Sequence, residues 1–210
     1  MARETLNTDA DLSRSVKNLI MIEPRFAQIV DEAARLRLRR TDQGFSALAE
    51  LIISQQLSVA ASDTIVRRLQ DADLFTRDSI AGAGSAQLRA CGVSGQKITY
   101  LKALAESRID LESLRDETDA MVIETLTSLR GIGVWTAEIY LMFALGRPDV
   151  FPAGDLALRE AGRMLLDLSD RPKESDMRRI AAGWQPFRTA AAHLLWIHYR
   201  AMKGRDGVRS

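Results

Sequence analysis

The stretch LRGIGVWTAE, residues 129–138, places two glycines one residue apart between two apolar patterns of helical spacing. Those patterns predict one helix over residues 121–129 and another over residues 134–145, so only RGIG connects them. A turn this short needs backbone angles that glycine adopts at low cost. The amides and the positive dipole end at the start of the second helix also form an anion site. The pattern indicates either a tight turn that binds nothing or a hairpin whose Gly131 and Gly133 admit a phosphate.

Apolar residues recur at helical spacing along nearly the whole chain. The stripes cover residues 12–20, 26–33, 45–53, 64–69, 96–105, 120–129, 134–145, 156–166 and 187–202. No segment sustains the alternation that is typical of a half-buried strand. We therefore predict an all-α protein, in which the glycine- and proline-containing break at 146–154 can separate two lobes.

Composition excludes several classes of protein. The 210 residues carry 29 basic and 28 acidic side chains, a balance that argues neither for nor against nucleic acid. The single cysteine, Cys91, excludes an internal disulfide framework and a four-cysteine iron–sulfur cluster. His193 and His198 lie five apart, which does not place two metal ligands on one helix face, so no zinc site is expected. No apolar run resembles a signal peptide or a membrane span, which predicts a soluble, cytoplasmic protein.

Two consecutive motifs carry a resemblance to a known family. LTSLRGIGVWTAEIYLM, followed by the loop RPDVFPAGDLALRE, resembles the helix-hairpin-helix of the DNA glycosylase superfamily with its Gly/Pro-rich loop and invariant aspartate. Three further stretches support it: LAELIISQQLSVAAS, VSGQKITYLKALAES and WQPFRTAAAHLLWIHY. The chain is most similar to the DNA-3-methyladenine glycosylase II family, in a compact form with no room for an N-terminal β domain.

The resemblance covers roughly residues 20–200 and implies a fold. It predicts one catalytic unit, residues 1–210, built from two helical lobes with the active site in the cleft between them. Residues 42–150 would form the central lobe, with the helix-hairpin-helix at about 121–145. Residues 1–41 and 155–210 would form the other lobe.

Asp155 stands directly before the helical stretch LALREAGRMLLDL, where an aspartate is well placed to cap the helix N-terminus. From the residues alone, capping is the favoured interpretation. The resemblance implies a second role, because the family's catalytic carboxylate occupies this position. In a glycosylase the bond between base and sugar breaks through an oxocarbenium-like state. A fixed carboxylate stabilises that positive charge and can orient the attacking water.

The resemblance also assigns pocket roles to two tryptophans. Superfamily members that cut the DNA backbone have a lysine at the position of Trp135, where it forms a Schiff base. Tryptophan there predicts a monofunctional enzyme that uses water as its nucleophile. Trp135 and Trp196 are expected to line the pocket for a flipped, electron-poor base. Either one alone would equally suit an ordinary core position.

Other positions of the motifs are expected to meet DNA. Gln56, in SQQLS, aligns with the side chain that fills the gap left by a flipped base, with Gln55 and Leu57 as alternatives. A merely polar helix end is the simpler interpretation of that glutamine pair. The resemblance places a DNA phosphate against Gly131, Gly133 and Thr136. It also implies that a monovalent cation, Na⁺ or K⁺, is bound by the backbone carbonyls of Thr127, Leu129 and Ile132.

Together these observations predict a base-excision repair enzyme that removes alkylated purines from double-stranded DNA and leaves an abasic site. The expected substrate is 3-methyladenine, with 7-methylguanine and ethenoadenine as further candidates. We expect a monomer that requires no cofactor, with no iron–sulfur cluster and no zinc, has no membrane partner, and acts at nucleoid DNA in the cytoplasm. The alternative is a non-catalytic helix-hairpin-helix module that binds DNA.

Overall fold

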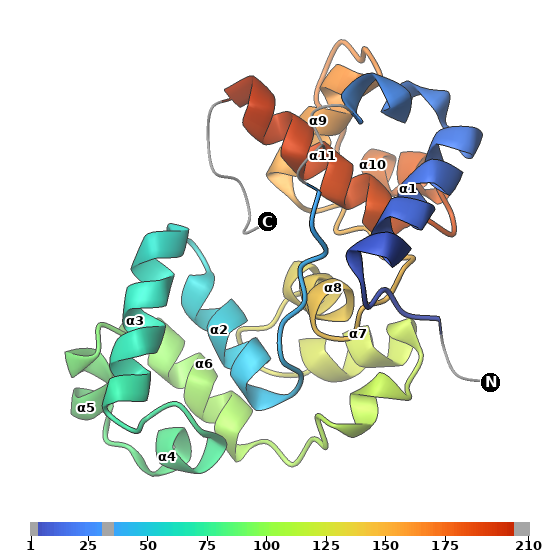
Figure 1. The fold of residues 1–210 in the computed structure, drawn as a ribbon. Coiled ribbons are helices and arrows are strands. Elements are labelled where there is room, and N and C mark those ends of the chain that lie inside the picture. Colours follow the sequence, from blue (N-terminus) through green and yellow to red (C-terminus); the bar gives the residue numbers. More distant parts are fainter. Residues whose placement is uncertain (1–3, 31–35, 204–210) are drawn as a thin grey trace. The chain divides into compact units, whose positions relative to one another are not determined.

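The computed structural model describes residues 4–30 and 36–203, and these form helices and turns with no strand among them (Figure 1). The α-helices are α1 (Asp9–Ile22), α2 (Phe45–Ser54), α3 (Val59–Asp71), α4 (Arg77–Gly82), α5 (Ser85–Ala90), α6 (Gly95–Glu106), α7 (Asp119–Thr127), α8 (Val134–Phe143), α9 (Leu156–Leu165), α10 (Glu174–Ala182) and α11 (Arg188–Lys203). Two 3-10 turns are η1 (Pro24–Ile29) and η3 (Ser113–Arg115). The all-α prediction is confirmed. No helix in the described ranges is long and apolar enough to cross a membrane.

The structure differs from the predicted helices in two ways. The apolar pattern after Pro24 forms the 3-10 turn η1, which ends at Ile29, and residues 31–33 of the predicted stripe lie outside the described residues. The helices α4, α5 and α10 were not predicted. The first two are six residues long, too short for an apolar stripe to repeat. A capping signal was available, because Thr76 and Ser79 bond reciprocally at the start of α4.

The chain divides into two compact units. Unit 1 contains residues 1–40 and 141–210, and unit 2 contains residues 41–140. The second boundary therefore falls inside α8, whereas the sequence suggested residue 150. Residues 141–150 belong with unit 1 because their backbone is bonded there. Leu6 N donates to Gly146 O at 2.8 Å, and the Arg40 guanidinium donates to Leu6 O and Ala144 O at 2.8 and 2.9 Å.

Unit 2 is built around α6, which packs against α2, α4 and α5 (Figure 1). The apolar faces of α2 and α6 are fully buried, with Leu48, Ile52 and Leu101 at 0% exposure. These positions follow the i, i+4 spacing that the sequence pattern identified, so burial of that stripe accounts for the packing. The C-terminal end of α2 lies beside the N-terminal end of α6.

Unit 1 is built around α11, which packs against α9, α1 and η1. Trp184 fills its core, since its ring meets Phe26 edge-on at a centroid distance of 5.1 Å and Phe151 at 5.4 Å. Such edge-to-face pairs contribute beyond the apolar area that they bury. Trp184 is therefore a core residue.

His193 lies on α11 among apolar and aromatic neighbours. Its ring stands edge-on to Phe143 at 5.7 Å and to Trp196 at 6.1 Å, and its Nδ1 lies 2.9 Å from Thr189 O. That contact makes Nδ1–H the donor and leaves Nε2 unprotonated. Burial lowers the pKa of His193 from 6.5 to about 4, and the nearby charges of Arg39 and Arg200 act in the same direction.

Acid should therefore destabilise the fold through His193. The folded pKa is depressed, so stability is complete above the unfolded pKa of about 6.5 and is lost as pH falls toward about 4. Between pH 8 and pH 5 the loss should reach about 2 kcal/mol, which lowers Tm by roughly 4–8 °C. His193→Gln keeps a donor for Thr189 O but does not titrate, so its Tm should depend less on pH. An equal acid dependence of Tm in both proteins would contradict this assignment.

Candidate functional site

The connection between α7 and α8 uses its two glycines for different reasons. Gly131 has φ +93°, and a Cβ at this position would collide with the ring of Tyr100. Gly133 is outside the positive-φ region, and its Cβ would meet nothing within 4 Å. Gly131 is therefore required by backbone conformation and close packing. Gly133 instead leaves an open approach to the start of α8.

The hairpin closes with its own backbone. Ile132 N donates to Leu129 O at 3.1 Å, and Ala137 N donates to Gly133 O at 3.1 Å, so Gly133 is the residue that directly precedes α8 and accepts its first helical bond. Amides in the first turn of a helix have no intrahelical acceptor, and the helix dipole is positive there. Val134, the first helical residue, is 44% exposed. The start of α8 thus has the features that favour an anion.

The cation predicted at the hairpin would use the carbonyls of Thr127, Leu129 and Ile132. Leu129 O already accepts the bond from Ile132 N, although a carbonyl oxygen has a second lone pair. Within the described ranges, no group of three His, Cys, Asp or Glu side chains could hold a metal ion. The carbonyl site for Na⁺ or K⁺ stays a prediction.

The loop after α2 separates the three candidates for the gap-filling side chain. Gln55 is half-buried, and its Nε2 donates to Gly131 O at 2.9 Å. Gln56 is exposed and has φ +57°, a left-handed conformation that is uncommon for a residue with a side chain. Leu57 is 40% exposed. Gln56 and Leu57 are therefore presented to solvent, whereas Gln55 is tied to the hairpin.

In α8 the predicted site residues differ in accessibility. Trp135 is half-buried, while Thr136 is only 3% exposed. This burial does not favour the phosphate contact predicted for the Thr136 hydroxyl, which stays a prediction. The side chain of Tyr140 reaches another part of unit 2, since its hydroxyl accepts a bond from Gly44 N at 3.0 Å.

In unit 1, Asp155 caps α9. Its Oδ1 accepts bonds from Ala157 N at 2.9 Å and from Leu158 N at 3.0 Å, and the residue is 6% exposed. The capping interpretation is therefore correct. The cap uses one carboxylate oxygen for both amides, so it also fixes the orientation of the other oxygen. A negative charge is favourable at this positive end of the helix.

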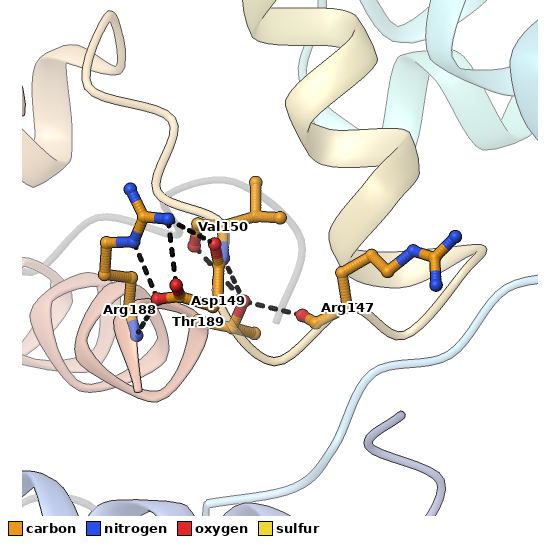
Figure 2. Close-up of polar contacts among 5 residues, drawn as sticks. All are labelled: Arg147, Asp149, Val150, Arg188 and Thr189. Atoms are coloured by element: carbon orange, nitrogen blue, oxygen red, sulfur yellow. Dashed lines mark hydrogen bonds and ion pairs between the residues drawn. The ribbon is translucent and has the colours of Figure 1, made fainter. Parts of the chain in front are cut away.

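The loop that leads to Asp155 is fastened to the start of α11 (Figure 2). Arg188 donates from Nε to Asp149 Oδ1 at 2.7 Å and from Nη2 to Asp149 Oδ2 at 3.0 Å. Thr189 Oγ1 donates to Arg147 O at 2.8 Å and accepts from Val150 N at 3.1 Å. The pairing of residues 39 positions apart had no local sequence signal. It anchors the chain at Asp149, six residues before Asp155.

Trp196 is 3% exposed and lies in an aromatic cluster with Phe143, at a centroid distance of 5.8 Å, and with His193. The indole Nε1 of Trp196 and the imidazole Nε2 of His193 are buried and have no hydrogen-bond partner within the described part of the chain. Unpaired buried polar atoms are uncommon in proteins. Trp196 is thus buried with an unused donor, and its pocket role stays a prediction.

Comparison with known proteins supports the resemblance. The family described as HhH-GPD superfamily base excision DNA repair protein matches residues 49–186. DNA-3-methyladenine glycosylase 1 of Schizosaccharomyces pombe is 34% identical over 181 residues, which cover 82% of this chain and 79% of that protein. The alkylbase DNA glycosidase-like protein mag2 of the same organism is 28% identical, over 91% of this chain and 95% of its own length.

Solved structures agree in fold. The 3-methyladenine DNA glycosylase of Schizosaccharomyces pombe, in complex with abasic DNA, matches with a TM-score of 0.79 at 30% identity and covers 93% of this chain and 100% of that chain. DNA-3-methyladenine glycosidase from Bacillus halodurans matches with a TM-score of 0.77 at 27% identity, over 98% of this chain and 95% of its own. The protein therefore belongs to the HhH-GPD superfamily of base excision DNA repair proteins.

Proposed function

We propose that this protein is a monofunctional DNA glycosylase that removes alkylated purines by hydrolysis and leaves an abasic site. The observation that carries the proposal is the carboxylate of Asp155, which is nine-tenths buried and held by two amides. The resemblance of its loop to the family's motif is what assigns this carboxylate the catalytic role. Relatives named for 3-methyladenine support the same substrate class. Among bases, 3-methyladenine is the first candidate, followed by 7-methylguanine and ethenoadenine.

The chemistry follows from charge. When the bond between base and deoxyribose breaks, positive charge develops on the sugar, and a pre-oriented carboxylate stabilises it without reorganising. A 3-methyladenine or 7-methylguanine base in DNA is already cationic, so it departs without strong acid assistance. Asp155 would then serve as the electrostatic partner of the sugar and would orient the attacking water. Trp135 and Trp196 would receive the flipped, electron-poor base.

DNA binding would rely on the hairpin and the loop after α2. The amides at Gly133 and Val134 would bind a phosphate, with the predicted cation as a bridge. Gln56 would fill the gap left by the flipped base, because it is exposed while Gln55 is engaged. We propose that the protein acts as a monomer on nucleoid DNA in the cytoplasm.

Asp155→Asn should abolish most base excision while leaving the fold and DNA binding intact. Asparagine caps a helix about as well as aspartate, so Tm should stay near that of the wild type. Loss of the charge should reduce the single-turnover release of methylated purines by about 10²–10³-fold. The assay is release of bases from methylated duplex DNA, with binding to abasic-site DNA as the control.

Two results would contradict this assignment. A folded Asp155→Asn protein with near-normal excision would show that Asp155 is only a helix cap. A wild-type protein that binds DNA and releases no base would favour a non-catalytic helix-hairpin-helix module.

The reaction should stop at the abasic site. Trp135 occupies the position at which backbone-cutting relatives place a lysine, and indole forms no Schiff base. Borohydride added during excision should therefore trap no covalent adduct between protein and DNA, and the product strand should stay intact until it is treated with alkali. An efficient adduct would mean that another amine attacks the sugar.

Substitution of Gly131 should lower the stability of the fold, whereas substitution of Gly133 should weaken DNA binding. Gly131→Ala should lower the free energy of unfolding by at least ~1 kcal/mol. Residue 131 has a positive φ, and an alanine Cβ there would collide with the ring of Tyr100. Gly133→Val should change Tm little, since its Cβ enters open space, but should weaken binding to all DNA sequences about equally. Gly133→Ser, which adds a Cβ with a good capping group, controls for the cap. A folded Gly133→Val protein that bound abasic-site DNA as tightly as the wild type would show that the turn connects two helices and binds no phosphate.

A further inference from the structure

The side chain of Gln55 connects two segments that are far apart in sequence. Its Nε2 donates to Gly131 O at 2.9 Å, across 76 positions, and so joins the loop after α2 to the hairpin before α8. Gln55 itself ends α2, with φ −52° and ψ 126°. A glutamine with its amide engaged in this way is not available to enter a DNA duplex.

The backbone that carries Gln55 is also fixed. Lys97, in the first turn of α6, donates from Nζ to Ile53 O at 2.6 Å. This bond satisfies one of the carbonyls left without an intrahelical partner at the end of α2. Since Ile53 precedes Gln55 by two residues, the glutamine side chain starts from a supported position.

Gly131 is held from a second side by Tyr100. The ring of Tyr100 lies where a Cβ of residue 131 would be, and its hydroxyl lies 2.6 Å from Gln96 Nε2 as a hydrogen-bond acceptor. The C=O of Gly131 and the N–H of Ile132 share one planar peptide unit. Gln55 bonds that unit at its oxygen, and Leu129 O accepts from its N–H at 3.1 Å. The Gly131–Ile132 peptide therefore has both of its polar groups engaged.

We propose that Gln55 is a positioning residue that sets the hairpin backbone for phosphate binding, acting through the Gly131–Ile132 peptide. The inference rests on the proposed function only in that the hairpin contacts a DNA phosphate. It gives the two adjacent glutamines different roles. Gln55 points back to the protein and orders the hairpin, and Gln56 is the one presented to solvent.

The test compares Gln55→Leu with wild type and with Gln70→Leu, a like substitution at an exposed position of α3 in the same unit. Leucine keeps the bulk of glutamine but donates no hydrogen bond. Gln55→Leu should weaken binding to both undamaged and abasic-site duplex about tenfold, which corresponds to about 1.4 kcal/mol. Hydrogen exchange at the amides of residues 131–134 should become faster. Gln70→Leu should bind as the wild type does.

A double-mutant cycle identifies the route of the effect. Gly133→Val blocks the phosphate directly, so adding Gln55→Leu to it should weaken binding by less than twofold more. Independent, additive losses would overturn the proposal, because Gln55 would then contact DNA by another route. Wild-type affinity of a folded Gln55→Leu protein would overturn it as well.

Excision kinetics separate positioning from gap filling. With Gln55→Leu, the protein concentration that gives half-maximal single-turnover excision should rise about tenfold, while the rate at saturation stays within about threefold of wild type. A large fall in the saturated rate with unchanged half-saturation would make Gln55 the gap-filling side chain and overturn the proposal. If no base is released by any variant, the proposed function fails, but the binding cycle still tests Gln55.

Should Gln55→Leu fail to fold, Gln55→Glu carries the same experiment. It keeps the length of the side chain and replaces the donor with a carboxylate that repels Gly131 O. Affinity for undamaged duplex reduced about tenfold or more would support the proposal. Unchanged affinity and unchanged hydrogen exchange in the hairpin would overturn it.

Discussion

The backbone amides at the start of a helix must find acceptors outside the helix, and this requirement organises both units. Six helices begin with a residue whose side chain accepts such an amide: Thr8, Ser58, Thr76, Ser94, Thr118 and Asp155. Helix α8 is preceded instead by Gly133, which brings no side chain and has open space where a Cβ would be. The carboxylate of Asp155 meets this demand at α9, whereas the residue before α8 has no side chain that could do so.

Local features of the site could be predicted from the sequence. The hairpin, the cap at Asp155 and the buried stripes of α2 and α11 each depend on residues within a few positions of one another. The sequence did not distinguish the two glycines, because the constraint on Gly131 comes from Tyr100, which lies on α6. The short helices α4 and α5 were not predicted, because six residues make less than two helical turns and an apolar stripe cannot repeat within them.

Long-range hydrogen bonds were the other feature that the sequence could not reveal. The motif SQQLS offers two adjacent glutamines, and the alignment that favoured Gln56 gave no partner for Gln55. The bond from Gln55 to Gly131 O depends on how α2 and α6 pack, which is set by apolar residues such as Ile52 and Leu101. Likewise, the ion pair between Arg188, the first residue of α11, and Asp149 joins residues that are 39 positions apart (Figure 2). Specific polar contacts of this kind follow from packing rather than from local pattern.

The Arg188–Asp149 ion pair and the Gln55–Gly131 hydrogen bond differ in strength for a physical reason. Arg188 and Asp149 form a bidentate, charge-assisted pair whose side chains keep about a quarter of their exposure, at 24% and 27%. Part of its Coulomb energy is screened by solvent. Its geometry nevertheless fixes two donor directions at once, which suits a loop that must hold the carboxylate of Asp155 in place. Gln55 offers a single neutral donor, and such a bond contributes about 1 kcal/mol. The loop before Asp155 is thus held by a charge-assisted ion pair, whereas Gln55 adds one neutral hydrogen bond to the hairpin.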